Sequence, residues 1–339
     1  MPAPETSTLL TKPRGRVLLT DHPWPEVDIE RSILAAAGFE VIAGSTETAS
    51  AADVEALVAA HDPVAIMTCW AEVSARAIDL PSSLRVVARM GVGLDNIAVA
   101  AATRRGAWVT NVPDYCVEEV SDHVLAFLLN AWRGIAHFDR EVKSGRWIPS
   151  SARNRRLADM TVGIVGYGRI GSATARKLAM GFHCRVLVTS PTLLENGPIG
   201  RELGPGVFAA DLATLQREAD AIVLHTPLAQ ETLHLVNDDF LSRCLRKPLL
   251  VNVSRGALVE NDALVRALDA GIVSGAALDV VEGEPVPPAG LIARTDVTVT
   301  PHIAFSSAAS LLELRRRSAE DVVRVLRGEP PLHPCNTLA

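Results

Sequence analysis

Short apolar runs alternate with segments of helical spacing along the first third of the chain. Such runs indicate strands that are buried on both faces, as in a parallel sheet. The predicted strands cover residues 17–20, 41–43, 64–68, 84–88 and 108–111, and the predicted helices cover 27–37, 51–60 and 99–105. This alternation predicts one doubly wound α/β unit.

The same alternation returns after residue 160 and continues to residue 300. The predicted strands are 161–165, 185–189, 207–209, 221–224, 249–252, 275–278 and 297–300, with helices at 169–180, 211–218, 238–243 and 261–270. This pattern indicates a second and fuller Rossmann-like unit. The predicted fold is therefore α/β, with two doubly wound Rossmann-like domains, parallel sheets and an interdomain cleft.

A long helical pattern separates the two units. It runs from Val117 to Gly145 without a break in its spacing, and its apolar content exceeds what one helix face needs. We therefore expect this helix to join two subunits of a homodimer. The last helical pattern, 308–327, follows the final strand, and we expect it to return to the first domain. The predicted domains are 1–120 with 306–339, and 121–305.

The composition fits a globular protein with packed cores. The chain has 339 residues, of which 48% are hydrophobic, and a formal net charge of −6. Because acidic and basic residues are interspersed, no nucleic-acid partner is expected, and the run Arg315 to Arg317 is predicted to be a solvated or ion-paired helix face. No apolar run reaches about 18 residues, and no signal-peptide pattern opens the chain, so a cytoplasmic protein without a membrane partner is predicted.

The cysteines show no pattern of metal binding. The five of them, Cys69, Cys116, Cys184, Cys244 and Cys335, lie far apart and form no Cys-x-x-Cys or Cys/His ligand spacing. This usage suits a reducing compartment, and we expect no structural metal.

Three glycines follow the first strand of the second unit. Residues 161–171 read TVGIVGYGRIG, so Gly166, Gly168 and Gly171 form the pattern Gly-x-Gly-x-x-Gly between a strand and a helix. The first glycine permits a tight turn, the second lets a pyrophosphate approach the backbone, and the third lets the helix pack closely. The helix would direct its N-terminal amides at the phosphates. We predict a dinucleotide site, with a turn that binds nothing as the alternative.

The next strand lacks the residue that usually distinguishes the two nicotinamide cofactors. An acidic residue about 20 positions after the glycines would bind the ribose 2′-hydroxyl of NAD. Here strand 185–189 is followed by Ser190, Pro191 and Thr192. A neutral strand end does not repel a 2′-phosphate, yet no arginine follows directly to bind one. NAD(H) and NADP(H) therefore both stay open.

Arg255, Glu284 and His302 each come shortly after one of the predicted strands of the second unit. Since the carboxyl ends of parallel strands meet at one edge of a sheet, we expect these side chains in one crevice. Hydride transfer to a 2-keto acid requires a cation that grips the carboxylate and an acid that protonates the carbonyl oxygen. Arg255 supplies the cation and His302 the proton, while Glu284 orients the imidazole and stabilises its protonated form. Taken singly, each residue is more typical of a structural role: the arginine of a surface ion pair, the glutamate of a loop, and the histidine of a satisfied hydrogen bond. The prediction therefore depends on all three together.

Beyond these residues, the chain resembles the D-isomer-specific 2-hydroxyacid dehydrogenases over residues 17–336. The motifs that carry the resemblance are RMGVGLDN (89–96), NVPDYCVEEVSDH (111–123), VGYGRIG (165–171), HTPL (225–228), NVSRGAL (252–258), DVVEGEP (279–285) and TPHI (300–303). The resemblance implies an NAD(P)-dependent oxidoreductase that interconverts 2-keto acids and D-2-hydroxy acids. It also implies that Arg255, Glu284 and His302 are the catalytic residues.

The resemblance further implies which residues bind the substrate and the cofactor. The backbone of Val92 and Gly93 would bind the substrate carboxylate together with Arg255, and Arg89 would add a positive contact or else form a buried ion pair. The first domain would thus bind the substrate and the second the dinucleotide. Implied cofactor contacts, besides the glycines, are Arg169 and Ile170 at the pyrophosphate, Ser190 at the ribose, Thr226 and Pro227 at the adenine, and Val120, Thr232, Val253, Asp279 and His302 near the nicotinamide.

Two alternative functions stay open. The segments DHPW (21–24), PDYC (113–116) and HIAFS (302–306) are similar to the branch of the family that contains the C-terminal binding proteins. That branch includes corepressors, so a dinucleotide-sensing binding protein with vestigial catalysis is one alternative. The other is an enzyme for a dianionic keto acid, such as a phosphorylated one, which arginines 153, 155 and 156 would bind.

Overall fold

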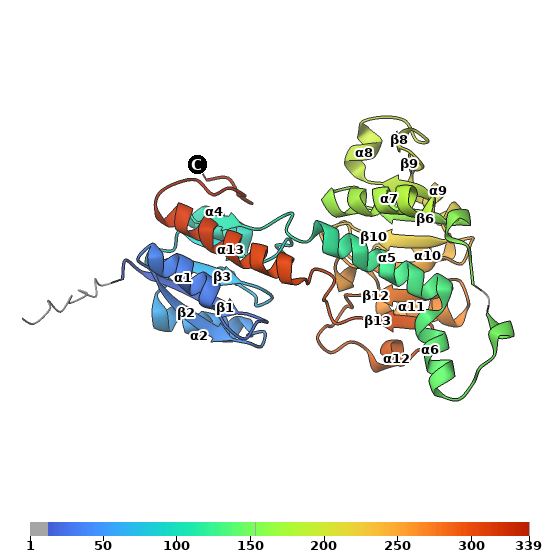
Figure 1. Ribbon diagram of the computed structural model, residues 1–339. Coiled ribbons are helices and arrows are strands. Elements are labelled where there is room, and N and C mark those ends of the chain that lie inside the picture. Colours follow the sequence, from blue (N-terminus) through green and yellow to red (C-terminus); the bar gives the residue numbers. More distant parts are fainter. Residues whose placement is uncertain (1–12, 153, 339) are drawn as a thin grey trace, which may run out of the picture. The chain divides into compact units, whose positions relative to one another are not determined.

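The computed structural model describes residues 13–152 and 154–338 (Figure 1). These residues form two compact units. Unit 1 contains residues up to Tyr115 together with those from Ala308 onward, and unit 2 runs from Cys116 to Ser307. The chain thus passes from one unit to the other at two places, 115–116 and 307–308.

Unit 1 contains a five-stranded sheet whose strands are all parallel. Its strands are β1 (Arg16–Asp21), β2 (Glu40–Ser45), β3 (Ala65–Thr68), β4 (Val86–Arg89) and β5 (Trp108–Thr110). Their order in the sheet is β2-β1-β3-β4-β5. The chain therefore places β2 on one side of β1 and then, from β3 onward, adds strands on the other side. Open α/β sheets bind ligands at the carboxyl ends of strands near such a topological switch point.

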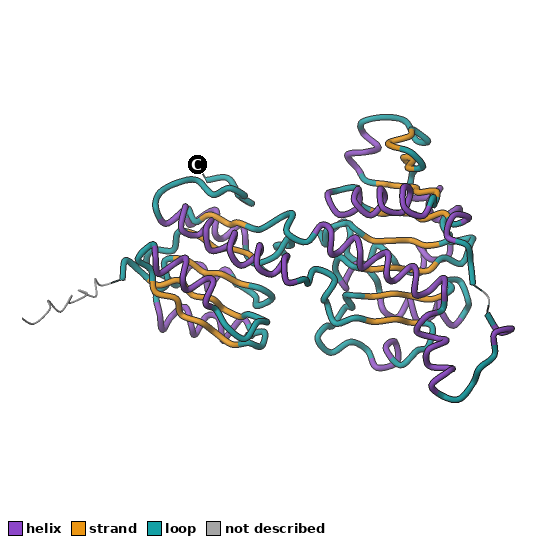
Figure 2. The backbone as a smooth tube through the Cα atoms, viewed as in Figure 1, coloured by secondary structure: helices purple, strands orange, loops and turns teal. Residues whose placement is uncertain are grey.

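Helices cover both faces of this sheet (Figure 2). One face packs against α2 (Ala51–His61), α3 (Ala75–Asp79) and α4 (Val99–Arg105) in one apolar cluster. The other face carries α1 (Asp28–Ala36) and α13 (Ala308–Leu326), which contact each other. Strands buried on both faces explain why the sequence shows continuous apolar runs here.

The C-terminal helix is fixed to unit 1 by charged groups as well as by packing. The guanidinium of Arg315 donates to both carboxylate oxygens of the buried Glu30, at 2.8 and 2.7 Å, and lies 4.8 Å from the centre of the Trp24 ring. Arg316 pairs with Glu320, and Arg317 pairs with Asp114 and Glu313. The predicted ion-paired helix face is confirmed.

Unit 2 contains an eight-stranded sheet in the order β13-β12-β11-β10-β6-β7-β9-β8. Its strands are β6 (Thr161–Val165), β7 (Arg185–Thr189), β8 (Glu202–Gly204), β9 (Val207–Ala209), β10 (Ala221–Leu224), β11 (Leu249–Asn252), β12 (Gly275–Leu278) and β13 (Val297–Val299). All pairs are parallel except β8 with β9 at one edge. The chain adds strands on one side of β6 up to β9 and on the other side from β10 onward. This topological switch point lies at the carboxyl end of β6, where the glycine-rich turn begins.

Two apolar clusters cover the faces of this sheet. One contains α5 (Val117–Arg133) and α7 (Arg169–Phe182), which lie side by side (Figure 1). The other contains α9 (Leu212–Glu218), α10 (Asp238–Ser242), α11 (Asn261–Asp269) and α12 (Ala289–Ile292). Successive residues of β10 point to opposite clusters, since Ile222 and Leu224 lie in one and Ala221 and Val223 in the other.

The prediction of one uninterrupted helix from Val117 to Gly145 is wrong. Helix α5 ends at Arg133, and α6 (Ile135–Lys143) begins after Gly134, which has a φ of +66°. Glycine adopts this left-handed conformation readily, and the side chain of Asn130 accepts from the backbone N–H of Ala136 at 2.8 Å, which caps the new helix. A helical spacing pattern does not detect a break at a single residue.

The burial of α5 also corrects the reason given for dimerisation. Four of its apolar side chains, Val124, Phe127, Leu128 and Trp132, lie in the core of unit 2 and are at most 6% exposed. They stabilise the unit itself, at about 1.5–3 kcal/mol for each large side chain. By contrast, α6 buries none of its residues.

The α/β class and the parallel sheets are confirmed. The sequence did not predict the antiparallel strand β8 or the short helices α3, α8 (Pro191–Glu195) and α12. Each of these elements is shorter than the window over which periodicity is detected. Within the part of the chain that the structure describes, no helix is long and apolar enough to cross a membrane.

Candidate active site

The register of the large sheet aligns the ends of six strands. Neighbouring strands pair through one row of residues, which runs in the order Thr189, Val165, Leu224, Asn252, Leu278 and Val299. The residues that directly follow this row include Ser190, Gly166, Val253 and Asp279. The sequence predicted all four as cofactor contacts, and the structure places them along one edge of one sheet.

The glycine-rich turn leaves room that a side chain would fill. Gly166 has a φ of +101°, and a Cβ atom there would lie 2.5 Å from the carbonyl oxygen of His225. A Cβ atom at Gly171 would collide with the carbonyl oxygen of Gly166. At Gly168, by contrast, a Cβ atom would meet no atom of the described residues within 4 Å. Two glycines therefore serve packing, and the middle one faces open space where a pyrophosphate fits.

Helix α7 begins directly after this turn. Arg169 is its first residue and is exposed, and Ile170 is half-buried. The first backbone N–H groups of a helix have no partner within the helix, and the positive end of its dipole favours an anion. The residues present thus fit the phosphates of a dinucleotide.

His225 lies behind the turn and was not predicted as a site residue. Its Nε2 atom is 3.0 Å from the hydroxyl of Thr174 on α7. Burial lowers the pKa of His225 to about 3, so the imidazole is neutral at physiological pH. A neutral ring adds no positive charge beside the phosphate site and packs against the glycine turn. The motif HTPL contained this residue, but spacing alone gave it no role.

Ser190 ends the second strand of the unit and caps the helix that follows. Its side chain accepts a hydrogen bond from the backbone N–H of Leu193 at 3.3 Å, at the start of α8. Thr232 stabilises its own loop in the same way. Its hydroxyl donates to the carbonyl of Pro227 at 2.8 Å and accepts from the N–H of Ala229. Thr226 and Pro227 lie in the same stretch, directly after β10 and His225.

Glu284 and His302 form a hydrogen-bonded pair. The Nδ1 atom of His302 lies 2.7 Å from Oε1 of Glu284, and the two side chains are 26% and 38% exposed. The second carboxylate oxygen accepts from the backbone N–H of Val281 at 3.2 Å. A carboxylate only accepts hydrogen bonds, so Nδ1 of His302 carries the proton of this bond. Nε2 is then the nitrogen that can exchange a proton with a substrate.

Asp279 holds the loop that carries His302. Its carboxylate is buried and accepts from the backbone N–H groups of Ile303 and Ala304, both at 2.9 Å. The N–H of His302 donates to the carbonyl of Asp279 at 2.8 Å. The segment that follows β13 is therefore fixed to the residue that follows β12.

Arg255 lies on a segment that packs against the loop of Glu284. The side chain of Asn252 donates to the carbonyl of Arg255 at 2.8 Å, and Arg255 is half-buried. A Cβ atom at Gly256 would collide with the backbone of Val281 and Glu282. This close approach brings the segment of Arg255 beside the segment of Glu284. The hydrogen bond between Glu284 and His302 adds the third predicted catalytic residue.

In unit 1, the segment after β4 presents backbone amides. Within the described part of the chain, the N–H groups of Val92 and Gly93 donate to no other residue, whereas the carbonyl of Val92 accepts from the side chain of Asn111 at 2.7 Å. Arg89 is 8% exposed, donates to the carbonyl of Met90, and fills the space beside Gly91. Its side chain thus supports this turn from inside unit 1.

Arg155 does not lie at the carboxyl edge of the sheet. Arg155 pairs at 2.8 Å with Asp220, which directly precedes β10, and Arg246 pairs with the same carboxylate. The amino ends of parallel strands form the edge opposite to the glycine turn. Arg155 therefore cannot serve the substrate site that the dianionic alternative required. Arg153 lies outside the described residues.

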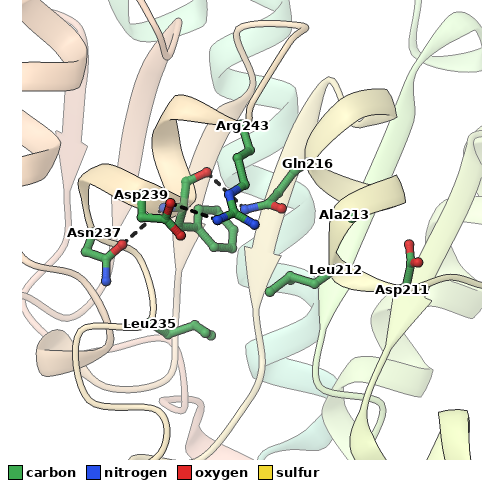
Figure 3. Close-up of a pocket in the computed structure, with 9 residues that line it drawn as sticks. Asp211, Leu212, Ala213, Gln216, Leu235, Asn237, Asp239 and Arg243 are labelled. Atoms are coloured by element: carbon green, nitrogen blue, oxygen red, sulfur yellow. Dashed lines mark hydrogen bonds and ion pairs between the residues drawn. The ribbon is translucent and has the colours of Figure 1, made fainter.

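A separate hollow of about 420 Å³ lies between α9 and α10 (Figure 3). Its polar side chains are already bonded within the chain. Arg243 donates to Asp239 at 2.8 Å, Gln216 donates to the carbonyl of Phe240 at 3.0 Å, and Asn237 caps α10. None of the predicted site residues lines it, so this hollow is not part of the candidate active site.

Known proteins share both the sequence and the fold of this chain. Residues 125–304 match the family model described as D-isomer specific 2-hydroxyacid dehydrogenase, NAD binding domain. The chain is 38% identical over 264 residues to a glyoxylate reductase from Korarchaeum cryptofilum, which covers 76% of this chain and 78% of the relative.

Solved structures give the same result. The NADPH-dependent glyoxylate/hydroxypyruvate reductase from Sinorhizobium meliloti, in complex with NADP and malonate, has a TM-score of 0.80 and 31% identity, covering 96% of this chain and 97% of that chain. D-lactate dehydrogenase from Aquifex aeolicus, complexed with NAD and lactic acid, has a TM-score of 0.78 and 26% identity, covering 92% and 96%. The chain is thus an NAD(P)-dependent oxidoreductase of 2-hydroxy acids, and it belongs to the D-isomer-specific 2-hydroxyacid dehydrogenase family.

Proposed function

We propose that this protein reduces a small 2-keto acid to the 2-hydroxy acid, in the D configuration where the product is chiral. Glyoxylate, whose product glycolate is achiral, is the first candidate. The observation that carries the proposal is the 2.7 Å bond between His302 and Glu284, held at the same sheet edge as the glycine turn. The reductases named above support a small substrate. The bound nicotinamide dinucleotide would supply the hydride.

The roles of the side chains follow from their chemistry. The Arg255 guanidinium would bind the substrate carboxylate with two N–H groups and polarise the carbonyl. As the carbonyl carbon gains the hydride, its oxygen gains a proton from Nε2 of His302. The Glu284 carboxylate holds Nδ1 and stabilises the imidazolium that donates this proton. In the oxidising direction the neutral imidazole accepts the proton again.

Unit 1 carries candidate groups of its own for binding a carboxylate. The backbone N–H groups of Val92 and Gly93 would donate to the carboxylate, and Arg89 would place positive charge beside them. We propose accordingly that unit 1 binds the substrate and unit 2 the dinucleotide. In unit 2, Arg169, Ile170, Thr226, Pro227, Thr232, Val253 and the buried Val120 would complete the cofactor site.

We propose that the protein accepts both NADH and NADPH. The end of β7 carries Ser190 rather than a carboxylate, and the hydroxyl is occupied as the cap of α8. A neutral residue there neither repels a 2′-phosphate nor binds the 2′-hydroxyl with a full charge.

The experiment is a turnover assay with each cofactor against a panel of 2-keto acids. We expect reduction of glyoxylate or a close analogue, and a fall in kcat of about 100- to 10,000-fold in His302→Asn. An equal rate in that variant would remove His302 from the mechanism. Absence of turnover with every acid, combined with capture of a protein partner that depends on bound dinucleotide, would instead favour the corepressor-like alternative.

The protein is further proposed to be a homodimer. Large apolar side chains are exposed on α6 and the segment after it, namely Ile135, Val142, Trp147 and Ile148. A contiguous patch of exposed apolar groups marks a surface for association, and we propose that these four side chains form one. The proposed interface therefore starts at α6 instead of along α5.

A further inference from the structure

The segment that carries His302 ends where the chain leaves unit 2. His302 lies five residues before Ser307, and the other passage between the units, at 115–116, directly precedes α5. The hydroxyl of Ser307 donates to Oε1 of Glu119 on the first turn of α5, at 2.7 Å. A hydrogen bond within unit 2 thus links the residues next to the two places where the chain passes between the units.

A second tie links α5 to the start of the same segment. The Nε2 atom of His123 lies 3.0 Å from the hydroxyl oxygen of Thr300, which itself donates to Oδ1 of Asp279 at 2.6 Å. A hydroxyl has one hydrogen, and here Asp279 receives it, so the Thr300 oxygen must accept from His123. This assigns the proton to Nε2 of His123. The ring also packs edge-on against Phe127, at 4.5 Å between centroids.

These ties matter because His302 has an unfavourable backbone conformation. Its φ is +53°, in the left-handed region that residues other than glycine seldom adopt. Such a conformation persists only where the surrounding structure holds it. Asp279 holds the residues directly after His302, while His123 and Glu119 hold the two ends of the segment.

The first turns of α5 are in turn bonded to the helix of the glycine turn. The ammonium of Lys177 on α7 donates to Asp122 at 2.6 Å and to Ser121 at 2.7 Å, and it pairs with Glu118 at 2.7 Å. Residues 118–123 therefore connect α7 to the segment 300–307.

We propose that His123 and Glu119 are positioning residues for the reaction, resting on the function proposed above. They hold the segment 300–307 fixed relative to α7, so that Nε2 of His302 stays at a constant distance from a dinucleotide bound at α7. Neither residue touches the reacting atoms in this account. Misplacing a proton donor by about 1 Å is enough to cost about 100-fold in rate.

The test compares His123→Leu with His123→Gln. Leucine keeps the bulk but cannot donate, whereas the amide nitrogen of glutamine reaches as far as Nε2. In His123→Leu we expect kcat to fall about 10- to 100-fold, while the NADH dissociation constant, measured by fluorescence, stays within about twofold. His123→Gln should recover most of the rate. His61→Leu, a histidine change at the end of α2 in unit 1, is the matched control and should leave kcat unchanged.

A second readout does not depend on catalysis. Amide hydrogen exchange of residues 300–307 should become about tenfold faster in His123→Leu, and it should stay at the original rate in His123→Gln. Glu119→Leu and Glu119→Gln form the same pair at the other end, because the amide oxygen of glutamine can still accept from Ser307. NADH binding by each variant shows that it has folded.

The outcomes separate the two proposals. Unchanged exchange in His123→Leu would overturn the positioning role, whatever the rate. Faster exchange with an unchanged kcat would show that the segment need not be held, which also overturns it. If kcat is insensitive to His302→Asn as well, the failure lies with the proposed function.

Discussion

The Nδ1 atom of His302 lies 2.7 Å from Oε1 of Glu284, although 17 residues separate the two in the sequence. This pairing leaves the opposite ring nitrogen to exchange a proton. In Glu284→Gln the amide oxygen can still accept the hydrogen bond, but it cannot stabilise a positive imidazolium. We expect kcat to fall by about 10- to 1,000-fold with KM little changed, measured by steady-state kinetics.

The chain offers a matched control two residues earlier. Glu282 is 36% exposed, close to the 38% of Glu284, but it pairs with His234 at 2.8 Å. Glu282→Gln should leave kcat within about threefold. Equal losses in the two variants would mean that the loop needs negative charge in general, and no loss in Glu284→Gln would contradict its role.

The glycines predict two different defects. In Gly166→Ala the new Cβ atom would lie 2.5 Å from a backbone oxygen at a φ of +101°, so the protein should be destabilised by several kcal/mol or fail to fold. In Gly168→Ala the Cβ atom meets open space, so thermal stability should be preserved while the affinity for the dinucleotide falls at least tenfold. Thermal melts and titration with NADH measure the two quantities. Undiminished affinity in Gly168→Ala would argue that the pyrophosphate binds elsewhere.

Ser190 can be changed without loss of its structural role. Aspartate caps a helix as well as serine does, so Ser190→Asp should retain the bond to Leu193 and the stability of α8. The added charge should repel a 2′-phosphate and favour the 2′-hydroxyl of NADH. We expect the ratio of NADPH to NADH dissociation constants to rise at least tenfold, as measured by calorimetry. A ratio that does not move would show that the 2′-position lies away from the end of β7.

His225 predicts a pH dependence of stability. Its pKa is lowered to about 3 in the folded protein and is about 6.5 in an unfolded chain, so the unfolded state binds more protons between these values. The unfolding free energy should therefore be unaffected by this group above pH 6.5 and should fall below it, by at most about 1.4 kcal/mol per pH unit. Denaturant unfolding of the wild type and His225→Asn at pH 7 and pH 5 measures the difference. If both lose the same free energy, His225 does not stay neutral when buried.

The proposed interface predicts the mass in solution. Sedimentation should give twice the chain mass of 36.1 kDa for the wild type. Ile135→Glu together with Trp147→Ser should shift the protein to one chain, because both side chains are exposed and apolar, at 60% and 76%. Met180→Glu is the control, since Met180 is 64% exposed on α7, away from the segment. A wild-type mass of one chain would exclude the dimer.

The sequence alone determined the α/β class and the position of the dinucleotide turn. Both follow from local rules, because a strand buried on two faces must be apolar throughout, and the turn needs glycine where a Cβ atom would collide, as at Gly166 and Gly171. The carboxyl ends of parallel strands also share one edge of the sheet, so the sequence alone groups Arg255, Glu284 and His302.

Tertiary structure decided what depends on side-chain direction and on packing over long separations. His123 meets Thr300 across 177 positions, and Arg155 meets Asp220 at the edge of the sheet away from the turn. No period along the chain encodes these pairs, since each depends on where loops of particular length fold back. The break at Gly134 belongs here too, because a glycine continues a helix or ends it according to what packs beside it, here the ring of Phe138.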